Sequence, residues 1–189
     1  MIYFLRHGST DWNENLNSDG EKDPRCQGRC DLHLNDKGRK QALEIKEELK
    51  NIKFDKIICS PLIRAKETLS IAYDSIAPII YDNRIIERDF GEFEGLTRSE
   101  FDFKAFWNIY SDQKFDKAES ILEVQNRVFN LLDELRDNPS ENVLIVAHGG
   151  VGLVLMSYFE GIPEDGNYLS FELGTGKLKE YSFEKILKR

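Results

Sequence analysis

Three short apolar runs, each followed directly by polar residues, constrain the fold of this 189-residue chain more than any other feature. The runs are MIYFL at the N-terminus, IIC within DKIICS, and VLIVA within NVLIVAHGG. Runs of this length, rich in β-branched residues, are typical of strands that are buried on both faces. The segments between them have helical periodicity. Strands that alternate with helices indicate a mostly parallel sheet covered by helices on both faces.

The segments between the strands also carry helix-start signals. Asn35 can cap a helix from Asp36 to about Ile52, whose apolar residues fall on one face. Ser60 is placed to cap the helix after the second run, with Pro61 as its first residue. The remaining expected elements are a strand at 79–86, helices at 98–110, 119–137 and 150–159, and a hairpin at 168–183 that turns at 174–176. We therefore predict an α/β three-layer sandwich, formed as a single domain over residues 1–189.

Composition and charge narrow the class of function. Hydrophobic residues make up 40% of the chain and charged residues 32%, as in ordinary globular proteins. The formal net charge of −8 argues against nucleic acid or an anionic membrane as the main partner. No secretory signal and no membrane-spanning run are recognisable. The only cysteines are Cys26, Cys30 and Cys59, too few for a disulfide framework, which favours the cytoplasm.

Chemically active side chains gather where the apolar runs end. In open parallel sheets, ligands bind beyond the carboxyl ends of the strands, so RHG, CSPLIR and AHGG should meet at one edge. Guanidinium groups match phosphate oxygens, and helix N-termini bind anions through free amides. The edge therefore predicts a phosphoryl pocket formed by two arginines, two histidines and a helix-start amide: Arg6, Arg64, His7, His148 and Gly149.

His7 and Glu87 are the candidate reactive groups of this pocket. The nearby arginines disfavour an imidazolium, so His7 is expected to be neutral and able to attack phosphorus. A metal ion is not required, because the arginines supply the charge stabilisation. Glu87, just after a predicted strand, is the candidate acid for the departing oxygen. Glu92 and Glu94 are its rivals in the following loop.

Five motifs occur in order along residues 1–160: FLRHGSTDWN, RCQGRCDLHLNDKG, CSPLIRAKET, IIERDFGEFEGL and VLIVAHGGV. Together they resemble the motifs of the histidine phosphatase superfamily, which includes the cofactor-dependent phosphoglycerate mutases. The resemblance implies that His7 becomes a phosphohistidine and that Glu87 acts as proton donor and later as base toward water. It also implies a set of residues that hold the phosphoryl group or lie beside it: Arg6, Asn13, Arg64, His148, Gln27 and Gly28.

Two features favour the phosphatase branch over the mutases. Gln27-Gly28 resembles the phosphatases, since the mutases usually have Ser-Gly. His148 follows Glu87 by only 61 residues, an interval shorter than in the mutases, whose extra segment carries basic residues for a substrate carboxylate. Here that segment offers Arg98, Lys104 and Lys114 but no adjacent arginine pair.

We therefore predict a metal-independent phosphomonoesterase that acts on a small-molecule phosphate monoester without a cofactor. A phosphoglycerate mutase is the enzymatic alternative. A phosphate- or phosphoprotein-binding module is the non-enzymatic one, although mere binding does not require His7 and Glu87 together.

Two departures from the family pattern and two side-chain groups complete the predictions. Ser9 stands where the family often has Glu, and residues 14–24 form an insertion expected beside the pocket. Cys26, Cys30 and His33 have a spacing that hints at metal ligation, but no fourth ligand is evident, so a structural role is favoured. A helix is expected to pack over the pocket with five aromatic residues: Phe101, Phe103, Phe106, Trp107 and Tyr110.

Overall fold

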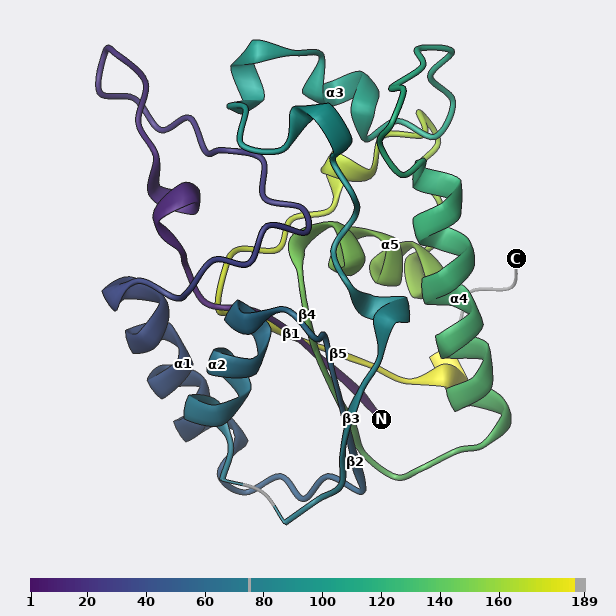
Figure 1. Cartoon of the computed structure of the whole chain (residues 1–189). Coiled ribbons are helices and arrows are strands. Elements are labelled where there is room, and N and C mark those ends of the chain that lie inside the picture. Colours follow the sequence, from purple (N-terminus) through teal and green to yellow (C-terminus); the bar gives the residue numbers. More distant parts are fainter. Residues whose placement is uncertain (75, 186–189) are drawn as a thin grey trace.

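A computed structural model describes residues 1–74 and 76–185 (Figure 1). Its centre is a five-stranded sheet in the order β3-β2-β4-β1-β5. Strands β1 to β4 pair in parallel, and β5 pairs antiparallel with β1. The strands are β1 (Ile2–Arg6), β2 (Lys56–Cys59), β3 (Ile79–Tyr81), β4 (Val143–Ala147) and β5 (Leu178–Tyr181). Residues 75 and 186–189 of the expected domain lie outside the described residues.

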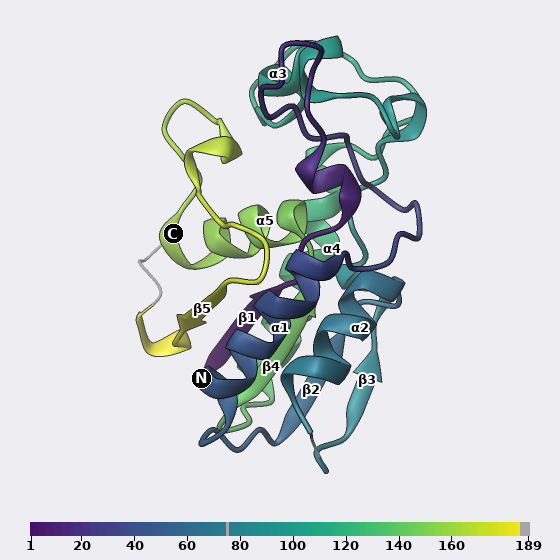
Figure 2. The same cartoon turned by 90° about the vertical axis from the view of Figure 1, so that its left-hand side faces the viewer.

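Helices cover both faces of this sheet, which confirms the predicted α/β sandwich (Figures 1 and 2). One face carries α1 (Asp36–Leu49) and α2 (Ile63–Ala72), and the other carries α4 (Ile121–Asp137) and α5 (Gly149–Glu160). All five residues of β4 are buried: Leu144 and Val146 pack toward α1 and α2, whereas Ile145 packs toward α4 and α5. Burial on both faces explains why the strand sequences are continuously apolar.

Two of the predicted helix starts have different outcomes. Asn35 caps α1 as expected, because its side chain accepts a hydrogen bond from the amide of Gly38 at 2.9 Å. The prediction for Ser60 and Pro61 is wrong. Helix α2 begins at Ile63 after Leu62, which makes no side-chain cap. The Ser60 hydroxyl is instead hydrogen-bonded to His148.

Three expected elements are shorter than predicted or absent. The strand at 79–86 ends at Tyr81, since the Asp82 carboxylate binds the amide and guanidinium of Arg84 and turns the chain into a 3-10 helix. The helix at 98–110 is reduced to a 3-10 turn and α3 (Phe103–Phe106). The hairpin at 168–183 is wrong, because only 178–181 forms a strand and it pairs with β1. Leu173 packs into the core instead of a second strand.

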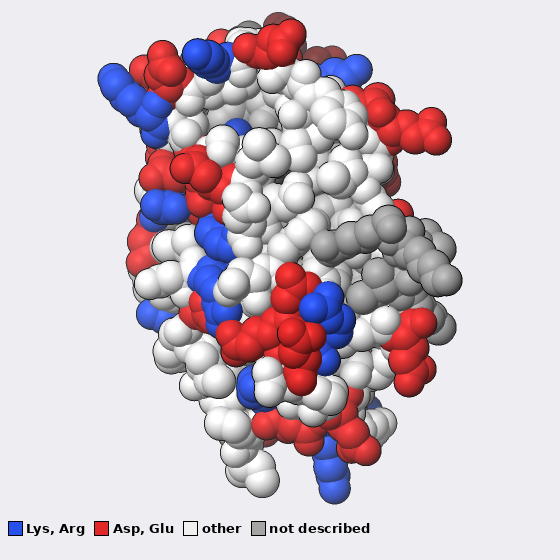
Figure 3. All heavy atoms as spheres, turned by 90° about the vertical axis from the view of Figure 1, so that its right-hand side faces the viewer, with Lys and Arg blue, Asp and Glu red and all other residues white. Residues whose placement is uncertain are grey.

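The carboxyl ends of the parallel strands point toward the long connections in the upper half of Figure 1. Among the described residues, no helix is long and apolar enough to cross a membrane. Acidic and basic side chains are interspersed on the face that Figure 3 shows. On α4, for example, Arg136 pairs with Asp133 and Asp137.

Candidate active site

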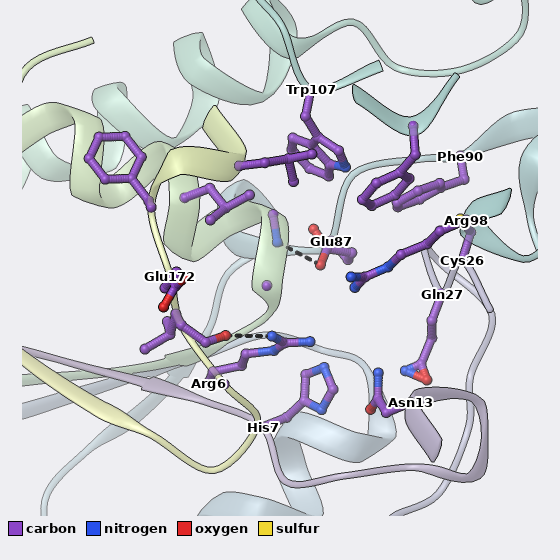
Figure 4. A pocket seen from close by; sticks show the side chains of 18 of the residues that line it. Arg6, His7, Asn13, Cys26, Gln27, Glu87, Phe90, Arg98, Trp107 and Glu172 are labelled. Atoms are coloured by element: carbon purple, nitrogen blue, oxygen red, sulfur yellow. Dashed lines mark hydrogen bonds between the residues drawn. The ribbon is translucent and has the colours of Figure 1, made fainter. Parts of the chain in front are cut away.

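A cavity of about 520 Å³ lies at the carboxyl edge of the sheet (Figure 4). The predicted site residues that line it are Arg6, His7, Asn13, Gln27, Glu87 and Gly149. Arg64, His148 and Gly28 are not among the lining residues, although the His148 ring lies beside the His7 ring and the Gly28 carbonyl holds the Arg64 guanidinium. The structure thus brings the strand-end residues and the later motifs together around one space.

His7 follows β1 and is almost completely buried. Its Nδ1 lies 2.7 Å from the carbonyl oxygen of Gly8, so Nδ1 carries the proton and donates it to that carbonyl. Nε2 is left with a free lone pair. Burial, followed by the charges of Arg64 and Arg6, holds the pKa of His7 well below its usual value. The ring is therefore neutral at physiological pH and can act as a nucleophile.

Arg64 is fully buried in the first turn of α2. Its two terminal nitrogens donate to the carbonyls of Cys30 and Gly28 at 2.8 and 2.7 Å. Gly28 therefore acts through its backbone, by holding this guanidinium in place. Glu67, three residues after Arg64 on α2, binds His33 and the amide of Leu34.

Arg6 is the last residue of β1, directly before His7, and its Nη1 donates to the Leu173 carbonyl at 2.5 Å (Figure 4). Burial lowers the pKa of Arg6 to about 10, and the positive charges of Arg98 and Arg64 act in the same direction, while Glu87 opposes them. At neutral pH the guanidinium remains protonated. Two permanent positive charges thus flank the His7 ring.

His148 is fully buried at the N-terminus of α5. Its Nε2 lies 2.6 Å from the Ser60 hydroxyl, and the centroids of its ring and the His7 ring are 5.2 Å apart. Burial, Arg64 and His7 push the pKa of His148 well below its ordinary value. If the Ser60 hydroxyl donates to Nε2, the proton of the neutral ring lies on Nδ1.

Asn13 and Gln27 present amide groups from the loop after β1. The Thr10 hydroxyl donates to the Gln27 Oε1 at 2.6 Å, and the Thr10 amide donates to the Asn13 Oδ1 at 3.1 Å. Because both side-chain carbonyls are occupied in this way, the NH2 groups are the parts left free to bind a ligand.

Buried donors without partners concentrate at this site. Throughout the described residues, five buried side-chain nitrogens lack a hydrogen-bond partner, and four of them belong to predicted site residues. These four are Arg6 Nε, Gln27 Nε2, Arg64 Nε and His148 Nδ1. A buried donor without a partner costs about 1–3 kcal/mol, so native proteins rarely keep several together. A bound anion with several acceptor oxygens satisfies such a set.

Glu87 faces His7 across the cavity (Figure 4). Its carboxylate accepts hydrogen bonds from the amides of Arg88 at 2.8 Å and Gly150 at 3.0 Å, at the start of α5. Its rivals lie elsewhere. Glu94 accepts from the amides of Gly28, Arg29 and Cys30, and therefore serves the loop that holds Arg64. Glu92 is about half-exposed and does not line the cavity.

The cavity also contains residues that sequence reasoning did not assign to the site. Arg98 enters it, whereas Lys104 and Lys114 do not line it. Phe103 and Trp107 form part of its wall, the buried Phe106 makes an edge-on contact with Trp107, and Tyr110 is exposed and does not line the cavity. Leu169, Phe171, Glu172 and Leu173 come from the segment predicted as a hairpin strand. The sequence predicts a hairpin strand for this segment, and for that reason it does not assign these residues to the site.

The cysteines form no metal site in this structure. No group of three or more potential metal ligands occurs among the described residues, and His33 binds Glu67 instead. Cys26 lines the cavity, and burial raises the pKa of its thiol to about 12. The thiol is therefore protonated and a poor nucleophile at neutral pH.

Comparison with known proteins agrees with this geometry. The family model of the histidine phosphatase superfamily (branch 1) matches residues 2–186. The uncharacterized phosphatase PhoE of Bacillus subtilis is 33% identical over 162 residues, which cover 85% of this chain and 77% of PhoE. The probable phosphoglycerate mutase GpmB of Shigella dysenteriae is 31% identical over 171 residues, covering 86% of this chain and 76% of GpmB.

The fold of this chain is also similar to that of a solved phosphatase structure. The mycobacterial glucosyl-3-phosphoglycerate phosphatase has a TM-score of 0.75 at 26% identity, over 94% of this chain and 87% of that one. The resemblance read from five motifs is thereby confirmed over nearly the whole length. The chain is an enzyme of the histidine phosphatase superfamily, branch 1.

Proposed function

We propose that this protein hydrolyses phosphate monoesters through a phosphohistidine on His7. The observation that carries the proposal is the set of four unpartnered donors on Arg6, Gln27, Arg64 and His148. Arg6, Arg64 and His148 lie near the neutral His7 ring, and the four donors match the oxygens of a phosphoryl group. Membership of the family implies a phosphate ester as substrate.

The reaction takes two steps. In the first, His7 Nε2 attacks phosphorus, the bond to the ester oxygen breaks, and the protonated Glu87 carboxyl gives its proton to that oxygen. In the second, Glu87 takes a proton from a water molecule, the water oxygen bonds to phosphorus, and the bond to Nε2 breaks. Inorganic phosphate leaves, and both residues return to their starting states.

The guanidinium groups of Arg6 and Arg64 stabilise the charge that develops on the transferred oxygens. They are fixed by backbone carbonyls before substrate arrives, so little reorganisation accompanies the reaction. We therefore propose that turnover does not depend on an added metal ion and persists in EDTA.

Phosphoglycerate mutase activity is the second candidate, because GpmB is among the relatives. In a mutase, the dephosphorylated substrate must stay bound beside the phosphohistidine until the phosphoryl group is transferred back to it. Of Arg98, Lys104 and Lys114, the basic residues considered above as anchors for a carboxylate, only Arg98 lines the cavity. Hydrolysis is accordingly the favoured outcome. A pure binding module is disfavoured, because the Glu87 carboxylate beside a bound phosphate serves chemistry and not affinity.

The first experiment measures p-nitrophenyl phosphate turnover in EDTA from pH 5 to 8. We expect turnover by the wild type and none by His7→Ala, with His33→Ala as the control because His33 lies outside the cavity. Mass spectrometry of the protein after treatment with 2,3-bisphosphoglycerate, together with an assay for conversion of 3-phosphoglycerate to 2-phosphoglycerate, distinguishes a hydrolase from a mutase. Absence of wild-type turnover at every pH would favour the binding module.

Glu87→Gln tests the proton donor. The variant should slow phenyl phosphate hydrolysis much more than 2,4-dinitrophenyl phosphate hydrolysis, because a good leaving group departs without protonation. Equal slowing of both substrates would count against Glu87 as the acid.

A further inference from the structure

The segment that carries Glu87 is held by an ion pair for which the reaction above has no use. Residues 87–90 are irregular and run between two 3-10 helices, so regular secondary structure does not fix their backbone. A proton donor must nevertheless lie within about 2.6–3.2 Å of the oxygen that it protonates. The position of this segment must therefore be fixed by side chains that reach it from elsewhere in the fold.

Arg127 of α4 holds the backbone just before the acid. Its Nη1 donates to the carbonyls of Ile86 and Arg84 at 2.6 and 2.7 Å. Its Nε and Nη2 donate to the two carboxylate oxygens of Glu119 at 2.7 and 2.9 Å. All three nitrogens of the guanidinium are thus in use, and a fork of this kind fixes geometry as well as charge.

Glu119 completes the support on the other side of the acid. The carboxylate oxygen that binds Arg127 Nη2 also accepts a hydrogen bond from the amide of Asp89 at 3.1 Å, and the Glu119 amide donates to the Asp89 carbonyl at 2.9 Å. The Glu119 carbonyl accepts from Arg88 Nε at 2.7 Å. The pair therefore contacts the chain one residue before Glu87 and two residues after it.

This ion pair is largely shielded from solvent and is anchored in the core. The side chains of Arg127 and Glu119 are only 16% and 11% exposed. Helix α4 packs against α5, whose first turn supplies the Gly150 amide that binds the Glu87 carboxylate. Replacing a buried ion pair by apolar side chains is often neutral for stability, so stability alone does not account for this one. Its geometry does, because α4 fixes the backbone of the acid while α5 fixes its carboxylate.

We propose that Glu119 and Arg127 are positioning residues for Glu87. The inference rests on the proposed function of Glu87 as the proton donor. By holding the backbone on both sides of the acid, the pair keeps the Glu87 carboxyl within reach of the leaving oxygen. Phosphate esters of aliphatic alcohols depend most on that proton, so the pair determines whether this enzyme accepts them as substrates.

Substitution of the pair tests this role through the leaving group. The quantity measured is the ratio of kcat/KM for phenyl phosphate, which has a poor leaving group, to kcat/KM for 2,4-dinitrophenyl phosphate, which has a good one. Arg127→Gln should lower this ratio by about tenfold or more, because a displacement of about 1 Å at a reacting group costs up to about a hundredfold. Glu119→Gln should lower it in the same direction. Arg127→Lys should recover part of the loss, since an ammonium keeps the charge without the fork.

Arg29→Gln is the matched control. The Arg29 guanidinium lies 3.4 Å from the same Glu119 carboxylate and 3.2 Å from that of Asp89, but its side chain is 43% exposed. Its removal should leave the ratio unchanged, as expected for an exposed ion pair. Urea unfolding is measured for every variant, because loss of folded enzyme lowers both kcat/KM values equally and does not change their ratio.

A double variant shows whether the pair acts through the acid. In Glu87→Gln/Arg127→Gln the ratio should equal that of Glu87→Gln alone, since no acid remains to be positioned. A lower ratio in the double variant would overturn a role through Glu87.

Two further results overturn the inference, and Glu87→Gln distinguishes them. If Glu87→Gln lowers the ratio but Arg127→Gln and Glu119→Gln change it no more than Arg29→Gln does, Glu87 is the acid and the pair does not position it. If Glu87→Gln leaves the ratio unchanged, the proposed function of Glu87 fails, and the positioning role fails with it. A decrease with Arg127→Gln but not with Glu119→Gln overturns the role of Glu119.

Discussion

Ser60→Ala is the most informative single perturbation of this site. The Ser60 hydroxyl and His148 Nε2 are both buried and lie 2.6 Å apart. When the hydroxyl donates to Nε2, the imidazole proton is placed on Nδ1, which has no hydrogen-bond partner and which we propose donates to the phosphoryl group. Alanine removes that donor. The neutral ring can then move its proton to Nε2, and Nδ1 would present a lone pair to an anionic oxygen.

The expected magnitude follows from the cost of one buried hydrogen bond. Loss of a partner for a buried polar group costs about 1–3 kcal/mol. If this cost falls on phosphoryl transfer, kcat/KM decreases by a factor of roughly 5 to 150. The decrease should be similar for phenyl phosphate and 2,4-dinitrophenyl phosphate, because the role we propose for His148 is to bind the transferred group and not the leaving oxygen.

The assay compares kcat/KM for both substrates with the free energy of urea unfolding. Ser157→Ala is the control, since Ser157 is also buried but its hydroxyl donates to the Val154 carbonyl within α5. Both variants should lose some stability, and only Ser60→Ala should lose the stated activity. An active Ser60→Ala with unchanged kcat/KM would refute the assignment of the His148 proton to Nδ1.

Two further predictions follow from steric contact and from proton linkage. A Cβ at residue 150 would lie 2.3 Å from Trp107 Cη2 and 2.5 Å from Glu87 Oε1. Gly150→Ala should therefore lower the free energy of urea unfolding by about 1–3 kcal/mol and, by displacing the Glu87 carboxylate, reduce kcat/KM at least about tenfold. Wild-type values of both quantities would contradict this prediction. The lowered pKa values of His7 and His148 mean that the unfolded chain binds more protons below about pH 6.5. Stability should therefore fall as pH drops from about 6.5 toward the folded-state values, each histidine contributing a slope approaching about 1.4 kcal/mol per pH unit. Urea unfolding of His7→Asn between pH 7 and pH 5 should show a shallower dependence than the wild type, and identical slopes would show that His7 does not contribute.

The sequence by itself determined the elements whose signals are local. Continuous apolar runs specified β1, β2 and β4, and the Asn35 cap with its apolar stripe specified α1. Because parallel strands end at the same edge, the order of the elements was enough to bring Arg6, His7 and His148 together. Strand content and helix periodicity depend on near neighbours in the chain, so both can be read without knowing the tertiary structure.

Only the tertiary structure decided the parts that depend on contacts between distant segments. Ser60 has the local character of a helix cap, but its hydroxyl binds a ring 88 positions away. Likewise, Glu87 and Glu94 are alike in sequence, and only their backbone partners distinguish the proposed acid, which lines the cavity, from a carboxylate that supports a loop. Arg98 was one of three basic residues that the sequence offered after Glu87, and only the fold shows that it lines the same cavity as His7. The physical reason is that irregular segments gain stability from the groups they meet across the fold, and those partners are not encoded in the segment itself.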